Sequence, residues 1–220
     1  MESTFSIRSA LESAADLFAG KTRFVSFSEL AEATGVPEAE LCHEFGTVDQ
    51  LITRYYADLA ERCVEMLVEL NPQTALDRAG AFTFIMLDLL EERSAYVEMT
   101  FRDYAAAWGS DFRSRLADVA TTVLDAPDVP GINQVVLASG PLAAPGVEIF
   151  VRLVNTWLND KTEDRQRSTA LIDKVVRYYA SLATSSTATD GVDVIRYAVE
   201  AEYLPRIPFV SDWLFGSETK

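Results

Sequence analysis

Apolar side chains recur at helical spacing along nearly the whole chain, and this periodicity constrains the fold more than any other feature. Early in the chain, Ile7, Leu11 and Phe18 share one stripe, and late in the chain Val147 and Val154 belong to another. Such spacing brings apolar residues onto one face of an α-helix. The hydrophobic fraction of 49% is ample for a packed core. The sequence therefore predicts an all-α fold.

Cap residues divide the first part of the chain into short helices. Ser26, with Glu29 three residues later, forms a capping box, and Gly35 suits the end of that helix. Pro37 is well placed at the first position of the next helix, 37–45, and Thr47 caps a long helix that follows. Two short helices joined by a tight glycine-containing turn are typical of a helix-turn-helix. A small helical bundle with no role in DNA binding explains the spacing equally well.

Residues 7–52 resemble the N-terminal domain of the tetracycline-repressor (TetR) family. The matching landmarks are Leu11, Ala14, Ala15, Leu17, Phe18, Ser26, Leu30, Ala31, Gly35, Val36, Leu41, Phe45 and Leu51. From there to about residue 185, the chain resembles the family only in helix layout and length. The resemblance implies a three-helix, DNA-binding-like domain over 1–47, a helical ligand-binding and dimerisation domain over 48–185, and an extension over 186–220 that packs on the domain.

The resemblance also identifies candidate DNA contacts, and several of them differ from the family pattern. The candidates are Arg23, Ser28, Pro37, Glu38, Glu40, Cys42, His43 and Val48. Family members usually carry Tyr in place of Cys42, Lys in place of Val48, and Ser or Thr in place of Pro37.

Charge opposes the DNA contact that the resemblance implies. Residues 37–45 contain three Glu and no Lys or Arg, which gives −3, and the chain carries a net −15. Lys and Arg supply most non-specific affinity for DNA, so we expect weak binding to duplex DNA. Glu38 and Glu40 suit the positive end of a helix dipole, although Glu can also accept a hydrogen bond from cytosine.

Aromatic residues and methionines are frequent in the middle of the chain, where they predict an apolar ligand pocket. The proposed lining is Phe82, Met86, Tyr96, Met99, Tyr104 and Trp108. Such side chains offer large, adaptable apolar surface, with a polar handle on Tyr and Trp. The expected effector is small, hydrophobic, and neutral or cationic. The alternative is that these residues are plain core.

Two late segments carry clear apolar stripes that predict either a dimer interface or further core. The stripe residues are Val151, Val154, Trp157, Leu158, Leu171, Ile172, Val175 and Tyr179. The resemblance implies that these two helices pair with their copies in a homodimer as a four-helix bundle. In the alternative interpretation the stripes face the core of their own domain.

Other protein classes find little support in the sequence. The single histidine, His43, allows no Ser/His/Asp triad, and no Cys/His cluster has zinc-ligand spacing. No phosphate-binding glycine loop is present, so we expect no enzyme, cofactor or metal. Two cysteines, Cys42 and Cys63, do not make a disulfide framework. The sequence contains no apolar run long enough to predict a membrane span. We expect a cytoplasmic protein.

Two functions remain open at this point. The resemblance implies a ligand-responsive transcriptional regulator, most simply a repressor, that binds a small hydrophobic effector. The alternative is a TetR-fold binding protein that has lost DNA binding and acts as a lipid or ligand carrier or as a protein partner.

Overall fold

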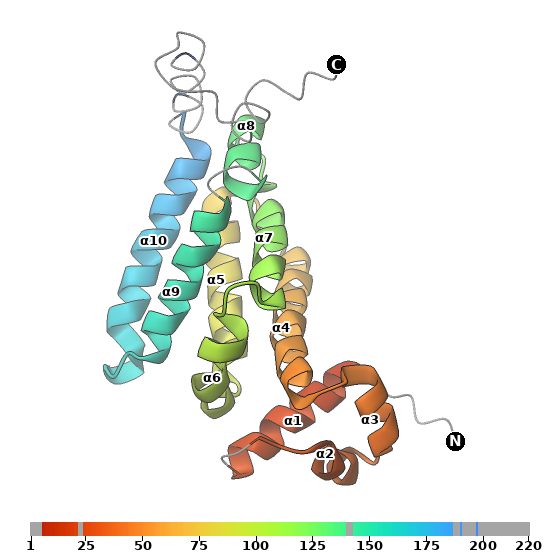
Figure 1. The fold of residues 1–220 in the computed structure, drawn as a ribbon. Helices are drawn as coiled ribbons and strands as arrows, with labels where there is room; N and C mark the ends of the chain where they lie inside the picture. Colours follow the sequence, from red (N-terminus) through yellow and green to blue (C-terminus); the bar gives the residue numbers. More distant parts are fainter. Residues whose placement is uncertain (1–5, 22–23, 140–142, 187–189, 191–196, 198–220) are drawn as a thin grey trace, which may run out of the picture.

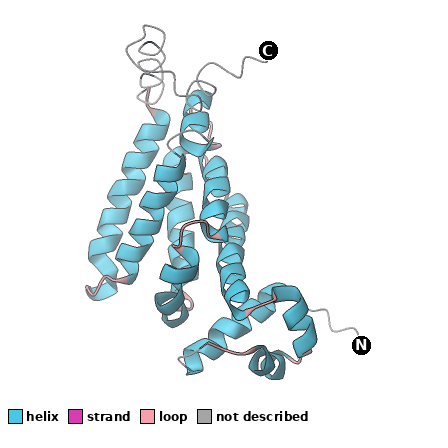
Figure 2. Ribbon diagram, in the orientation of Figure 1, coloured by secondary structure: helices cyan, strands magenta, loops and turns pink. Residues whose placement is uncertain are grey.

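The computed structural model describes residues 6–21, 24–139 and 143–186, together with Asp190 and Tyr197. In this part of the chain every regular element is a helix and there is no strand (Figures 1 and 2). The prediction of an all-α fold is confirmed. Most of the predicted extension, 186–220, lies outside the described residues.

Three short helices gather at one end of the long helix α4 (Val48–Leu70), and we call them the head (Figure 1). They are α1 (Ile7–Lys21), α2 (Phe27–Thr34) and α3 (Glu38–Phe45). Because their apolar residues point inward, Leu30 of α2 and Leu41 of α3 join the core that α1 begins.

Two caps of the head match the sequence predictions, and the start of α3 differs by one residue. Ser26 accepts a hydrogen bond from the Glu29 backbone N–H, and the Glu29 side chain accepts one from Ser26 in return. Gly35 ends α2 with a φ of 72°, a left-handed conformation that glycine adopts without strain. Pro37 stands immediately before α3, as its N-cap, rather than at its first position.

The remaining helices form the body, in which the longer ones lie roughly side by side (Figure 1). These are α4, α5 (Ala75–Glu91), α7 (Asp111–Leu124), α9 (Ala143–Leu158) and α10 (Gln166–Thr184). Shorter helical segments connect them: α6 (Ser94–Thr100), the π-helical η1 (Phe101–Ala105), α8 (Gly131–Gln134), the π-helical η2 (Val135–Ser139) and the 3-10 helix η3 (Glu163–Arg165). In Figure 1, α10 and α9 form one side of the bundle.

Ion pairs join the head to the body along α1. Arg8 contacts Asp58 of α4, with 3.0 Å between Nε and the carboxylate. Arg93, between α5 and α6, reaches Asp16 at 2.8 Å. Each pair links residues far apart in sequence, so together they fix the orientation of α1 against the body.

Aromatic rings fill the space beneath these ion pairs. The Phe18 ring of α1 meets Tyr96 of α6 edge-on, with 5.2 Å between centroids, and Tyr96 meets Tyr55 of α4 at 4.9 Å. Edge-to-face contact is a favourable arrangement for such rings. The head, α4 and α6 therefore share one continuous core.

Two tyrosine hydroxyls in this core have no hydrogen-bond partner within the described residues. They belong to Tyr55 and Tyr96, and burial raises the pKa of Tyr55 to about 12, so the group stays neutral. The neighbouring Tyr56 differs, because its hydroxyl lies 2.7 Å from that of Thr100. A buried hydroxyl without a partner costs on the order of 1–3 kcal/mol.

The contrast between these tyrosines gives a stability test. We expect Tyr96→Phe to leave the free energy of unfolding unchanged or to raise it, since it removes an unpartnered buried hydroxyl. Tyr56→Phe is the matched control, and it should lower the free energy of unfolding by about 1 kcal/mol, the usual net value of a hydrogen bond. Urea unfolding measures both. A larger loss for Tyr96→Phe than for Tyr56→Phe would contradict the hydrogen-bond pattern described here.

Candidate functional site

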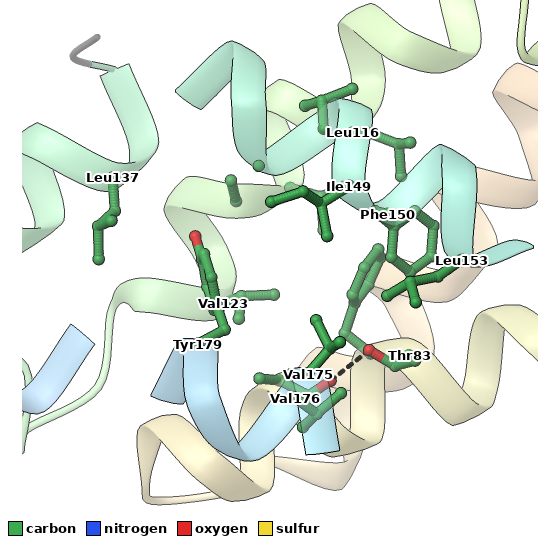
Figure 3. Close-up of a pocket in the computed structure, with 16 residues that line it drawn as sticks. Thr83, Leu116, Val123, Leu137, Ile149, Phe150, Leu153, Val175, Val176 and Tyr179 are labelled. Atoms are coloured by element: carbon green, nitrogen blue, oxygen red, sulfur yellow. Dashed lines mark hydrogen bonds between the residues drawn. The ribbon is translucent and has the colours of Figure 1, made fainter. Parts of the chain in front are cut away.

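An apolar cavity of about 100 Å³ lies between α5, α7, η2, α9 and α10 and opens to the surface at Ile149, which is 50% exposed (Figure 3). Apart from one threonine and one tyrosine, its lining is aliphatic or aromatic hydrocarbon. The lining residues are Ala79, Phe82 and Thr83 of α5; Leu116, Val119, Ala120 and Val123 of α7; Leu137 of η2; Gly146, Val147, Ile149, Phe150 and Leu153 of α9; and Val175, Val176 and Tyr179 of α10.

Small residues explain why a void remains at this point. Ala79, Ala120 and Gly146 come from three of the surrounding helices and carry little or no side chain. Protein interiors are otherwise close-packed, so space persists where facing positions lack side-chain volume. The cavity therefore follows from the placement of small residues on helices that are otherwise lined with large apolar ones.

The polar groups of the lining are few. The Thr83 hydroxyl donates to the carbonyl oxygen of Ala79 at 2.7 Å, within its own helix (Figure 3). The Tyr179 ring rises from α10 with its hydroxyl directed between Leu137 and Ile149 in this view. Burial raises the pKa of Tyr179 to about 12, so the hydroxyl is protonated at neutral pH. The cavity thus combines an apolar wall with one neutral hydroxyl.

A charged pair ties two of the cavity walls together outside the lining. Arg113 of α7 forms an ion pair with Glu148 of α9, and it also donates to the Ala106 carbonyl at 2.9 Å. Hydrogen bonds from Arg113 and from Arg152 hold the pKa of Glu148 below its ordinary value. Because these charges satisfy one another, they strengthen the α7–α9 contact without adding a charge to the cavity.

Of the six residues predicted to line a ligand pocket, Phe82 alone lines this cavity. Met86 and Tyr96 are buried in the core, and Met99 is 55% exposed. Tyr104 donates a hydrogen bond to Asp49 of α4, over 2.6 Å, beside the head. Trp108 is 82% exposed and stacks on Arg113, 4.4 Å from ring centroid to guanidinium carbon.

The structure places most of the predicted dimer stripe within its own chain. Five of its residues are buried within their own chain: Val151, Val154, Trp157, Leu158 and Ile172. They belong to the main core, and the Trp157 ring is covered by Arg165 at 3.9 Å. Within the single chain these five residues pack in the core, as the alternative interpretation expects, and they expose little surface to a second copy.

The other three residues of that stripe have different surroundings. Val175 and Tyr179 line the cavity, which sequence reasoning assigned to other residues. Leu171 is 43% exposed on the outside of α10. The sequence signal that could have located the cavity is the set of small residues on facing helices. An apolar stripe alone does not distinguish a close-packed core from the wall of a cavity.

The candidate DNA contacts lie mainly on the outer side of the head. Ser28 of α2 is exposed, as are Pro37, Glu38, Glu40, Cys42 and His43 in and beside α3. Val48 is half-buried against the main core, and Arg23 lies outside the described residues. The outward side of α3 therefore presents Glu38, Glu40 and Glu44 and no Lys or Arg.

The described residues contain no group of His, Cys, Asp and Glu side chains that could hold a metal ion. Cys63 is buried, where its thiol donates to the Phe82 carbonyl at 3.4 Å, and Cys42 is exposed. Among the described helices, none has the length and apolar character needed to cross a membrane. Comparison of the sequence with models of known protein families and with curated proteins finds no match.

Glycine replacement on two cavity helices tests the packing around the cavity. A Cβ added at Gly146 would lie 4.0 Å from the Tyr179 ring, an ordinary contact, and one added at Gly80 of α5 would meet nothing within 4 Å. We expect Gly146→Ala and the control Gly80→Ala each to raise the free energy of unfolding by about 0.5–1 kcal/mol, because alanine favours helix. Urea midpoints give the comparison. If Gly146→Ala alone destabilised the protein, α9 would have to pack more tightly on Tyr179 than described.

Proposed function

We propose that the protein is a ligand-responsive transcriptional regulator of the kind that the TetR resemblance implies. The observation that supports this proposal is the apolar cavity in the body, since a largely apolar concave site with one available hydroxyl, that of Tyr179, suits a small hydrophobic effector. The helix-turn-helix geometry of α2 and α3, mounted on α4, provides the second half of such a device.

The long helix α4 connects the two halves. Its first turns pack against the head through Leu51 and Ile52, and its later turns pack on α5 and α7, two of the cavity walls. A ligand that binds one arrangement of these walls more tightly shifts the population toward that arrangement. The head would then change its position, because α4 and the Arg8 and Arg93 ion pairs hold it to the body.

A regulator of this kind presents two heads to DNA, so the proposal includes a symmetric dimer. With the buried stripe excluded, we assign the interface to the outer surface of α9 and α10. Ile149 is 50% exposed there, Leu171 43% and Tyr178 71%. A two-fold interface uses the same patch on both subunits, and these residues form the apolar part of such a patch.

Charge insertion tests the dimer. We expect the wild-type protein to be a dimer and the double variant Leu171→Glu, Tyr178→Glu to be a monomer, because two-fold symmetry brings four new carboxylates into one interface. Light scattering after size-exclusion chromatography measures the mass, and circular dichroism checks the helix content. Val68→Glu, at an exposed apolar position of α4, is the control and should remain a dimer. A wild-type monomer at micromolar concentration would count against this interface.

The second candidate is a TetR-fold binding protein that does not contact DNA, and the charges of the head favour it. The outward side of α3 carries three glutamates, and Arg8 of α1 is engaged by Asp58 and Glu65. A polyanion would meet repulsion there, since phosphate contacts by Lys and Arg provide non-specific affinity.

Titration with DNA separates the two candidates. At about 0.1 M salt we expect the wild-type protein to bind sheared duplex DNA more weakly than the usual ~10⁻⁴ M limit for non-specific binding. Glu38→Lys with Glu40→Lys should tighten that binding and steepen the log–log salt slope by about −1.8, or −0.9 for each new phosphate contact. Fluorescence anisotropy measures both quantities.

The matched control reverses two charges at the far end of the body, with Glu69→Lys and Asp125→Lys, and should change DNA affinity much less. Specific binding to DNA from upstream of the protein's own gene, dependent on Ser28 and His43, would support the regulator. No binding to that DNA even at low salt would favour the second candidate. Tight binding of random DNA by the wild-type protein would show that the charges of α3 do not govern the contact.

A further inference from the structure

The Tyr179 hydroxyl is the one polar side-chain group of the cavity lining that forms no hydrogen bond among the described residues. Thr83, the other polar lining residue, already donates its hydrogen to the Ala79 carbonyl. We propose that the cavity binds a compact, neutral, single-ring molecule that carries one hydroxyl or carbonyl group, and that Tyr179 selects this group by a hydrogen bond. The inference rests on the proposed ligand-binding role and specifies the chemistry of the ligand.

Charge narrows the ligand class. No lining residue carries an ionisable acid or base other than the Tyr179 phenol, and the charged pair that joins α7 to α9, Arg113 with Glu148, is satisfied internally. An ammonium or carboxylate among these side chains would lose hydration and find no charged partner in the lining, which is unfavourable. A cationic effector, which the acidic sequence suggests, does not suit this cavity, and a neutral one does.

Size narrows it further. The cavity volume is about 100 Å³. An engineered protein cavity of about 150 Å³ lined by similar residues stays dry and binds benzene. The present cavity is smaller, so its interior holds at most a single ring, and a short substituent has to extend toward the opening at Ile149, which is 50% exposed.

Hydrogen-bond capacity sets the last requirement. The Tyr179 phenol can donate or accept, and its pKa of about 12 keeps it in the neutral form that does both. Its hydroxyl points away from α10, between Leu137 and Ile149, two other lining residues (Figure 3). A ligand with one hydroxyl or carbonyl group can satisfy this hydroxyl, whereas a pure hydrocarbon leaves it without a partner.

Calorimetric titration of the full-length protein with a matched ligand series tests the inference. Benzyl alcohol, ethylbenzene and benzylammonium have the same number of non-hydrogen atoms and differ in polarity and charge, and benzoate adds a negative charge. We expect benzyl alcohol to bind most tightly and each ion to bind at least roughly 100-fold more weakly. Tyr179→Phe should weaken benzyl alcohol by about three- to tenfold and leave ethylbenzene within about twofold. Ala120→Leu, which fills the cavity, should abolish binding of both.

Each contrary result would overturn the inference. Equal binding of benzylammonium or benzoate, equal weakening of both neutral ligands by Tyr179→Phe, or no binding of any neutral compound to the folded wild-type protein would do so. The charge comparison uses wild-type protein only, so it stands even if a variant fails to fold. These titrations contain no DNA. If neutral ligands bind but do not change the affinity for DNA, the proposed regulatory function is rejected. The inference about the chemical class of the ligand then still holds.

Discussion

The packing of α4 is the interaction on which the rest of the structure depends. This 23-residue helix is about 35 Å long and buries side chains near its start against the head and farther along against the body. Tyr55 and Tyr56 lie between these two regions, in contact with the rings of α6, η1 and α7. Because head and body share this one core, a change in the packing of α5 or α7 on α4 would also alter the packing where the head attaches to α4.

The cavity also depends on helices that pack against α4. Helices α5 and α7 each contact α4, and each offers a small residue, Ala79 or Ala120, to the space shared with α9 and α10. Filling that space would add dispersion contacts and apolar burial, so an unfilled cavity lowers stability relative to a close-packed alternative. A ligand that occupies it would supply the missing contacts, which is why ligand binding and the packing of the body are coupled.

Sequence reasoning succeeded where the determining interactions are local. The capping boxes at Ser26 and Thr47 involve residues three positions apart, so the sequence contains both partners. It failed where the answer depends on what lies opposite a helix. The stripe on α9 and α10 is real, yet periodicity does not specify whether it faces a second copy, as predicted for Trp157, or the chain's own core. Trp108 was predicted to line the ligand pocket because it is large and aromatic. It lies instead in a connecting turn, where it is exposed and packs against a single arginine.

Electrostatics divides the head into two unlike sides. On the inner side, carboxylates of α1 meet arginines of the body, as in the Asp16–Arg93 and Glu12–Arg62 pairs, and Arg8 meets Asp58 in the opposite sense. On the outer side, the glutamates of α3 face solvent. Arg8, Arg62 and Arg93 are thus engaged in holding the head and are not available to a partner of the outer side. Because the head is firmly attached, a change in the packing around the cavity would be transmitted to it. The glutamates on the outer side of α3 restrict which partner the head could bind. In the proposed regulator, sensing a ligand and binding DNA would therefore depend on different residues.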